Sequence, residues 1–193
     1  MNLENSTFKT LCRVYKTVIE MLKDRNYNTS NYQNQLSVDD IKKKYLENNL
    51  EIIVEHNKND KKIIILFYNG KFGIKEVNTL ITELNKKKIN NIILVVQEKL
   101  TSFGLKALKN SDINFEIFLT MNLIFNITKH ILVPKHVLLT KDEKNKLLKT
   151  LQCKLHQLPK ILKTDPISKY FNALTGQVFK IYRKNEIYYR VVV

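Results

Sequence analysis

Carboxylates that stand two residues before a lysine are the first candidates for chemistry in this chain. Metal-dependent nucleases use an Asp/Glu-x-Lys pair on one strand and a second acid on its neighbour, so that two carboxylates hold Mg²⁺ beside the lysine. The pattern occurs at Asp40/Lys42, Asp60/Lys62 and Asp142/Lys144. The surrounding sequence predicts helix starts at the first and the third and a turn at the second. Chance explains such matches in a chain rich in lysine, so a nuclease ranks third among the functions considered.

Histidine and cysteine spacing predicts neither a metal site nor a nucleophilic centre. His130 and His136 bracket a Val-Pro turn, while His56 and His156 are isolated from any ligand-type partner at metal spacing. The cysteines at positions 12 and 153 are expected to be buried or idle thiols in a reducing compartment. Four glycines cannot supply a phosphate-binding loop. We therefore expect no catalytic residue, no metal, no cofactor and no small-molecule substrate.

The first 128 residues predict an α/β domain with a partly parallel sheet. Apolar residues at helical spacing alternate with short β-branched segments, and this alternation favours helices packed on a sheet. Ser37 is the expected N-cap of the second helix, with acidic residues in its first turn. In chain order the expected elements are helix 6–24, helix 38–48, strands 50–55 and 62–68, a helix around 77–84, strand 92–96, helix 104–109 and strand 115–119.

Near residues 127–130 the pattern changes, and residues 129–193 predict a small α+β domain with a short mixed sheet. Thr140 and Glu143 have the spacing of a capping box, which predicts a helix start. Asp165 and Pro166 predict another, because aspartate caps a helix and proline at its first position loses no needed donor. Gly176 precedes a predicted hairpin of strands 178–182 and 187–193.

The chain carries a net charge of +15. Residues 129–193 hold 14 Lys/Arg and 4 Asp/Glu, so this third carries +10 and the first 128 residues carry +5. Such a surface attracts polyanions with strong salt dependence, and an acidic protein partner would satisfy it equally well. The excess of lysine and asparagine also indicates an AT-rich genome. No apolar segment approaches the roughly 18 residues of a membrane span, so we expect a soluble intracellular protein without membrane contact.

A series of motifs in the last third of the chain has a distinctive order and spacing. They are His130-Ile131-Leu132-Val133-Pro134-Lys135-His136, Leu158-Pro159-Lys160, Thr164-Asp165-Pro166, Gly176-Gln177-Val178 and Tyr188-Tyr189-Arg190-Val191-Val192-Val193. With the stretches 17–25, 71–75, 92–101 and 115–128 before them, they resemble one family over nearly the whole chain. That family is the fifth subunit shared by the eukaryotic nuclear RNA polymerases, whose C-terminal domain also occurs as a small subunit of the archaeal polymerase.

The resemblance implies two domains with separate tasks. Residues 1–128 would form a jaw domain with an inactive restriction-endonuclease-like layer, beside the downstream duplex DNA that enters the polymerase. Residues 129–193 would form an assembly domain that docks on the largest polymerase subunit. The residues that match the docking motif of the family are Pro134, His136, Leu158, Pro159, Asp165, Pro166, Gly176, Arg183 and Arg190. The expected DNA-proximal residues are Lys99, Thr101, Ser102 and Lys106.

Three departures from the family pattern stand out. Ser102 occupies a position where the family usually has proline, and Lys160 replaces an arginine, which weakens any bidentate contact. The family's Ser-x-Thr-Ala-Gly loop is absent, and residues 183–187 predict a tight hairpin instead. These departures, with the composition, are typical either of a large DNA virus or of a eukaryote with an AT-rich genome. The expected location is accordingly the nucleus, or the host cytoplasm and the virion.

The sequence therefore predicts a non-catalytic subunit of a multisubunit DNA-directed RNA polymerase, with catalysis in the large subunits. The expected partners are the largest subunit, other polymerase subunits and downstream duplex DNA. A free-standing basic nucleic-acid-binding protein on the same fold is the alternative. Tyr182, Tyr188 and Tyr189 could stack on bases in that case, although alternating aromatic residues on a terminal strand are more often core and interface.

Overall fold

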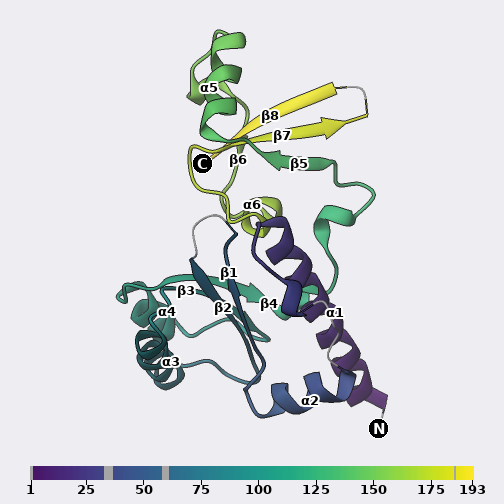
Figure 1. Cartoon of the computed structure of the whole chain (residues 1–193), viewed down its shortest axis with the longest axis vertical. Coiled ribbons are helices and arrows are strands. Elements are labelled where there is room, and N and C mark those ends of the chain that lie inside the picture. The colour runs from purple at the N-terminus through teal and green to yellow at the C-terminus, as the bar shows by residue number, and fades with distance from the viewer. Residues whose placement is uncertain (1, 33–36, 58–60, 185) are drawn as a thin grey trace. The chain divides into compact units, whose positions relative to one another are not determined.

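The computed structural model describes residues 2–32, 37–57, 61–184 and 186–193. The chain divides into two compact units, Met1–Phe125 and Asn126–Val193 (Figure 1). Each unit holds one four-stranded sheet of mixed direction. The α/β content and the small mixed sheets predicted from the sequence are thus both present.

The first unit is a sheet with helices on both faces. Its elements are α1 Asn2–Asp24, η1 Ser30–Tyr32, α2 Val38–Leu46, β1 Glu51–Glu55, β2 Lys62–Tyr68, α3 Ile74–Lys87, β3 Asn91–Val96, α4 Ser102–Lys109, β4 Asn114–Leu119 and η2 Thr120–Leu123. The strand order is β1-β2-β3-β4. Strand β1 runs antiparallel to β2, whereas β2, β3 and β4 are parallel.

After Asn91, strand β3 is apolar and buried, as expected for a strand with both faces covered. Ile92, Leu94 and Val96 pack in one cluster with residues of α3 and α4. On the other face, the Tyr15 ring of α1 lies 5.8 Å from the ring of Phe67, centroid to centroid. Figure 1 accordingly shows α3 and α4 on one side of the sheet and α1 on the other.

Three helices of this unit begin earlier than the sequence predicted, among them α3, which starts at Ile74 rather than near residue 77. Helix α1 starts at Asn2 rather than at residue 6, and α4 starts at Ser102 rather than at residue 104. The early start of α4 has a local cause, because the Thr101 side chain accepts a hydrogen bond from the Gly104 N–H and caps the helix. The predicted Ser37 cap of α2 is confirmed, since its side chain accepts from the Asp40 N–H.

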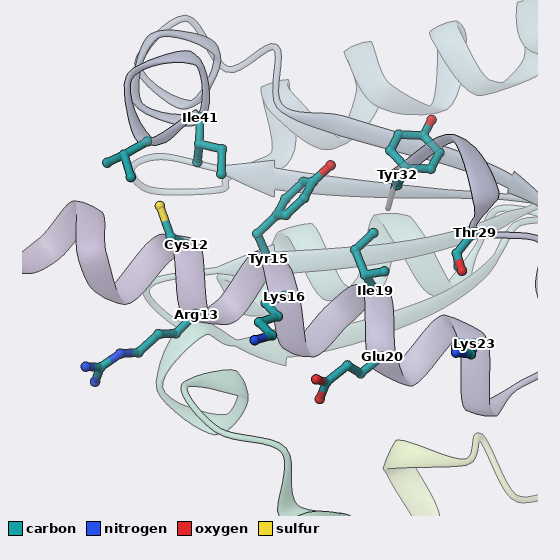
Figure 2. A pocket seen from close by; sticks show the side chains of 11 residues that line it. Cys12, Arg13, Tyr15, Lys16, Ile19, Glu20, Lys23, Thr29, Tyr32 and Ile41 are labelled. Atoms are coloured by element: carbon teal, nitrogen blue, oxygen red, sulfur yellow. The ribbon is translucent and has the colours of Figure 1, made fainter. Parts of the chain in front are cut away.

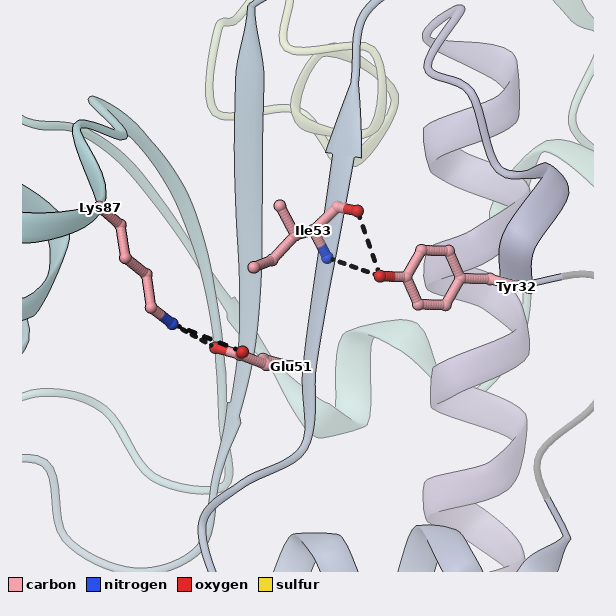
Figure 3. A network of polar contacts seen from close by, with 4 residues as sticks. All are labelled: Tyr32, Glu51, Ile53 and Lys87. Carbon is pink, nitrogen blue, oxygen red and sulfur yellow. Dashed lines mark hydrogen bonds and ion pairs between the residues drawn. The ribbon is translucent and has the colours of Figure 1, made fainter.

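Side-chain contacts hold strand β1 in place at the edge of the sheet and satisfy the backbone hydrogen-bonding groups of one of its residues. The Tyr32 hydroxyl donates to the Ile53 carbonyl at 3.1 Å and accepts from the Ile53 N–H at 3.0 Å. From the same strand, Glu51 pairs with Lys87 of α3 at 3.0 Å (Figure 3). Because an open edge strand is a template for pairing with another chain, the tyrosine protects this edge at its midpoint.

The second unit places one sheet between two apolar clusters. Its elements are η3 Ile127–Lys129, β5 Lys135–Leu138, α5 Lys141–Thr150, η4 Leu155–Gln157, β6 Lys160–Ile161, α6 Pro166–Tyr170, β7 Val178–Arg183 and β8 Glu186–Val192. The strand order is β5-β7-β8-β6, with only β6 and β8 parallel. The sequence predicted the hairpin and both helices but neither β5 nor β6, which are too short to show an alternating pattern.

Helix caps in this unit are those that the sequence predicted. Thr140 and Glu143 form a capping box at the start of α5. Asp165 caps α6, accepting the Ile167 N–H at 2.8 Å, and Pro166 is the first helical residue. The hairpin extends one residue further than predicted at each inner end, because Arg183 still pairs with Glu186.

Candidate functional site

The structure does not bring the nuclease-type carboxylates into one site. Asp40 lies in the first turn of α2, where the Ser37 hydroxyl donates to it at 2.8 Å, and Asp142 lies in the first turn of α5. Asp60 lies outside the described residues. Within the described part of the chain, no three His, Cys, Asp or Glu side chains gather closely enough to hold a metal ion. Nor does any described helix combine the length and apolar character needed to cross a membrane.

Five predicted docking residues converge on one cavity of about 220 Å³ in the second unit. They are Pro134, His136, Asp165, Arg183 and Arg190, and we call their cavity the arginine cavity. The strand register explains why three of them meet. Paired residues share a face and alternate residues repeat it, so the pairing of β5 and β7 puts His136, Ile181 and Arg183 on one face. Arg190, two residues before Val192, joins that face from β8.

The same register explains the walls of the arginine cavity. Further along this face, Phe179, Ile181 and Val192 form an apolar cluster with residues of β6 and α6. Ile161, Ile167 and Ile181 from this cluster line the cavity. The cavity therefore lies where the apolar core of the sheet face ends and its charged side chains begin.

His136 is held in a defined orientation and tautomer. Its Nδ1 lies 2.7 Å from the Pro134 carbonyl oxygen, and its ring packs edge-on against Phe179 with centroids 5.8 Å apart. A carbonyl only accepts, so Nδ1 carries the proton, and in the neutral ring Nε2 is left as an acceptor. Burial is the main cause that lowers the pKa of His136, with opposing contributions from the Pro134 carbonyl and Asp165. The imidazole is therefore neutral near pH 7.

The two arginines are exposed and keep their donors available. The Arg183 guanidinium carbon lies 5.1 Å from the centroid of the Tyr188 ring, a cation–π contact that orients it. Tyr188 in turn hydrogen-bonds Glu186, which raises the pKa of its phenol. In the part of the chain that the structure describes, neither Arg183 nor Arg190 forms an ion pair. The cavity thus offers two guanidiniums to an incoming acceptor.

The other predicted docking residues shape the unit and do not line the cavity. Leu158 is 7% exposed and packs with Val178 and Val191 on the opposite sheet face. The Pro159 carbonyl accepts the Val191 N–H at 2.8 Å, which ties β6 to β8. Gly176 has φ +85°, a left-handed value that glycine adopts at little cost, and its N–H donates to Val192. Because Leu158 is buried, it can contribute to docking only by shaping the unit.

Sequence reasoning missed the apolar mouth of the arginine cavity. Leu132 and Val133 line the cavity, Leu132 is 82% exposed, and the adjacent Ile131 is 94% exposed. The signal was present in the His-Ile-Leu-Val-Pro motif. However, nothing in the sequence tells an exposed apolar pair from one that is buried.

The expected DNA-proximal residues cluster at the carboxyl end of β3. Lys99, Thr101, Ser102 and Lys106 are all exposed, and Phe103 between them is 72% exposed. Ser102 is the first residue of α4, a position where proline is also favoured because its missing N–H is not needed there. The departure from the family's proline therefore leaves the helix start intact.

The start of α3 lies beside the start of α4. A Cβ atom placed on Gly104 would lie 3.5 Å from Val77 of α3 and 3.6 Å from the backbone of Gly73, the N-cap of α3. The positive ends of two helix dipoles thus meet at one edge of the parallel strands, near exposed lysines. At α3 the Glu76 carboxylate already accepts the Gly73 N–H at 2.9 Å, so the N-terminus of α4 and the exposed lysines are the groups at this edge that favour phosphate.

A larger cavity of about 570 Å³ lies along α1. Figure 2 shows Cys12, Tyr15 and Ile19 of α1 pointing toward Tyr32 and Ile41. Burial raises the pKa of the Cys12 thiol and raises the pKa of Tyr15 to about 12. Neither group is therefore activated as a nucleophile at neutral pH.

The described groups of both units are contact groups: guanidinium, imidazole, ammonium and exposed apolar side chains. They are carried by two units, one α/β and one with a small mixed sheet. Residues 5–84 match the family model of the RNA polymerase Rpb5 N-terminal domain, and residues 125–193 match that of the RNA polymerase Rpb5 C-terminal domain. The chain belongs to the Rpb5 family of RNA polymerase subunits.

Curated relatives agree with this assignment over most of the chain. The RPABC1 subunit of DNA-directed RNA polymerases I, II and III from Caenorhabditis elegans is 33% identical over 201 residues, covering 95% of each chain. The corresponding subunit from Dictyostelium discoideum is 34% identical, covering 91% of each. Subunit 5B of DNA-directed RNA polymerases IV and V from Arabidopsis thaliana is 34% identical, covering 89% of this chain and 82% of its own.

Proposed function

We propose that this chain is a non-catalytic subunit of a DNA-directed RNA polymerase and that it docks on the largest subunit through the arginine cavity. Family membership supports the assignment as a polymerase subunit, which is the first part of this proposal. The convergence of Pro134, His136, Asp165, Arg183 and Arg190 on one cavity supports the second. Phosphoryl transfer belongs to the large subunits, and this chain contributes contact surfaces.

The first unit, residues 1–128 in the boundaries expected from the sequence, acts as the jaw beside downstream duplex DNA. Its sheet is the restriction-endonuclease-like layer of the family, without nuclease activity. Lys99, Thr101, Ser102 and Lys106 face the duplex, supported by the N-terminus of α4. Contacts of this kind go to phosphates, so they position DNA without reading its sequence.

The second unit, residues 129–193 in the boundaries expected from the sequence, acts as the assembly domain, and its partners are the largest subunit and other polymerase subunits. In a cell that transcribes in a nucleus, the protein acts there. If a large DNA virus encodes it, the protein acts in the host cytoplasm and is packaged in the virion. The lysine-rich and asparagine-rich composition fits either origin.

Recovery of partners on the tagged full chain tests the docking proposal. The wild-type chain should retain the largest subunit at moderately high salt, whereas Asp165→Lys and Arg190→Glu should lose it. Lys149→Glu is the matched control, because Lys149 is an exposed residue of α5 that does not line the arginine cavity. Hydrogen exchange of the first unit should be unchanged in all three variants. Normal assembly of Asp165→Lys and Arg190→Glu would show that the interface lies elsewhere.

The net charge of +15 keeps a free-standing nucleic-acid-binding protein as the second candidate. That function predicts recovery of nucleic acid alone, with binding that falls steeply as salt rises. Mg²⁺-dependent cleavage by the isolated chain, abolished by one carboxylate substitution, would overturn both candidates.

A further inference from the structure

The arginine cavity holds two guanidiniums and has room for a small acceptor. Arg183 and Arg190 lie on the same sheet face and both line the cavity. Within the described residues neither is engaged by a carboxylate, although both influence the neighbouring His136. A planar guanidinium offers a fork of donors that matches a carboxylate with two parallel hydrogen bonds. The cavity is therefore arranged to receive an anionic group from outside the chain.

The surroundings favour a protein carboxylate over a nucleic-acid phosphate. Asp165 lines the same cavity as Arg183 and Arg190, so two positive charges and one negative charge leave +1, which matches one carboxylate better than the several phosphates of a nucleic-acid strand. Apart from His136, the remaining lining residues are apolar, and at about 220 Å³ the cavity suits a single side chain. At its mouth, the exposed Leu132 and the adjacent Ile131 form an apolar surface that a protein segment can cover and that a phosphate backbone would not.

We propose that the arginine cavity binds an aspartate or glutamate side chain of the docked polymerase subunit, between Arg183 and Arg190. A neighbouring apolar side chain of the same segment packs on Ile131 and Leu132. His136 accepts a hydrogen bond at Nε2 from a donor of that segment. This inference rests on the proposed docking function and adds the chemistry of the segment that is recognised.

Dissociation of the assembled complex measures the contribution of each arginine. Tagged full chains carrying Arg183→Gln or Arg190→Gln should release the largest subunit at least about tenfold faster than wild type, because loss of one partner of a desolvated charge pair acts mainly on the dissociation rate. The dissociation rate of Arg190→Lys should lie between those of wild type and Arg190→Gln, since lysine keeps the positive charge but not the paired donors of the guanidinium. Lys184→Gln, on the same hairpin but outside the cavity, should dissociate at the wild-type rate. Thermal unfolding of each variant checks that the second unit is folded.

A carbodiimide cross-link locates the carboxylate directly. In the complex assembled with Arg190→Lys, the new amine should form an amide with an Asp or Glu of the largest subunit, identified by mass spectrometry. In the free variant, the internal product with Asp165 is the one expected.

The outcomes separate this inference from the docking proposal. If the wild-type chain retains no polymerase subunit, the docking proposal fails and takes the inference with it. If wild type and both glutamine variants dissociate at the same rate, the inference is wrong while docking stands. If the glutamine variants assemble normally but lose affinity for a labelled duplex DNA, the cavity binds phosphate and the inference is overturned.

Discussion

The bidentate ion pair between Arg25 and Glu116 should be a principal tie in the first unit. Nη1 and Nη2 of Arg25 each lie 2.8 Å from one carboxylate oxygen of Glu116, across 91 residues of sequence. The side chains are only 5% and 19% exposed. The pair joins the end of α1 to edge strand β4, so it fixes the helix against the sheet.

Replacement of Glu116 by glutamine should destabilise this unit strongly. Glu116→Gln keeps the size of the side chain and one acceptor but removes the carboxylate charge that faces the nearly buried Arg25 guanidinium. Breaking a buried pair from one side costs roughly 3–5 kcal/mol, a large part of the roughly 5–15 kcal/mol of a typical domain. The double replacement Arg25→Met/Glu116→Leu removes both charges and should cost less than the single one.

Hydrogen exchange of the β4 amides measures the loss of stability in the first unit itself. A local measurement is needed because a chain of two units need not unfold in one step. Glu51→Gln is the matched control, since Glu51 and Lys87 pair at 3.0 Å with side chains 38% and 42% exposed. An exposed pair contributes about 0–1 kcal/mol. If Glu116→Gln and Glu51→Gln reduce protection equally, the assignment of Arg25–Glu116 as a structural tie is refuted.

Four further predictions concern single features. Tyr32→Phe should destabilise the first unit by roughly 1–3 kcal/mol in urea unfolding, because one hydroxyl satisfies both backbone groups of a residue of β1. Ser168→Ala should leave the melting temperature of the second unit unchanged or raised, since the buried Ser168 hydroxyl has no hydrogen-bond partner among the described atoms. The pKa of His136, measured by NMR, should lie below the ordinary histidine value of 6.5, because burial disfavours the charged ring. The stability that the neutral ring contributes is complete above pH 6.5 and is lost as the pH falls through the pKa of the folded state. His136→Gln should therefore make the stability of the second unit less dependent on pH in this range. Lys99→Gln/Lys106→Gln should weaken duplex binding by the assembled polymerase and reduce its salt dependence.

Local signals in the sequence predicted local structure well. The caps at Ser37, Thr140 and Asp165 were each predicted, because a cap depends on residues within one turn. The strand 92–96 was also predicted, because burial on both faces leaves a continuous apolar segment. The missed strand β6 has only two residues, and its pairing with β8 is a tertiary property.

The candidate site was predictable as a set of residues but not as a surface. Family motifs named Pro134, His136, Asp165, Arg183 and Arg190 from four separate segments, while the register and the cap of α6 bring them together. The same motifs could not tell that Leu158 is buried on the opposite sheet face, because apolar residues serve cores and interfaces alike. Long-range ties such as Arg25–Glu116 leave no periodic trace in the sequence.

The most direct test of docking through the arginine cavity is the stoichiometry of the largest polymerase subunit recovered with the tagged full chain. Recovery is made from its native cells at moderately high salt and measured by quantitative mass spectrometry. Docking predicts one copy of the largest subunit for each copy of the chain, lost on Arg190→Glu and kept on Lys149→Glu. Recovery of nucleic acid without polymerase subunits, or equal recovery with both variants, would contradict it.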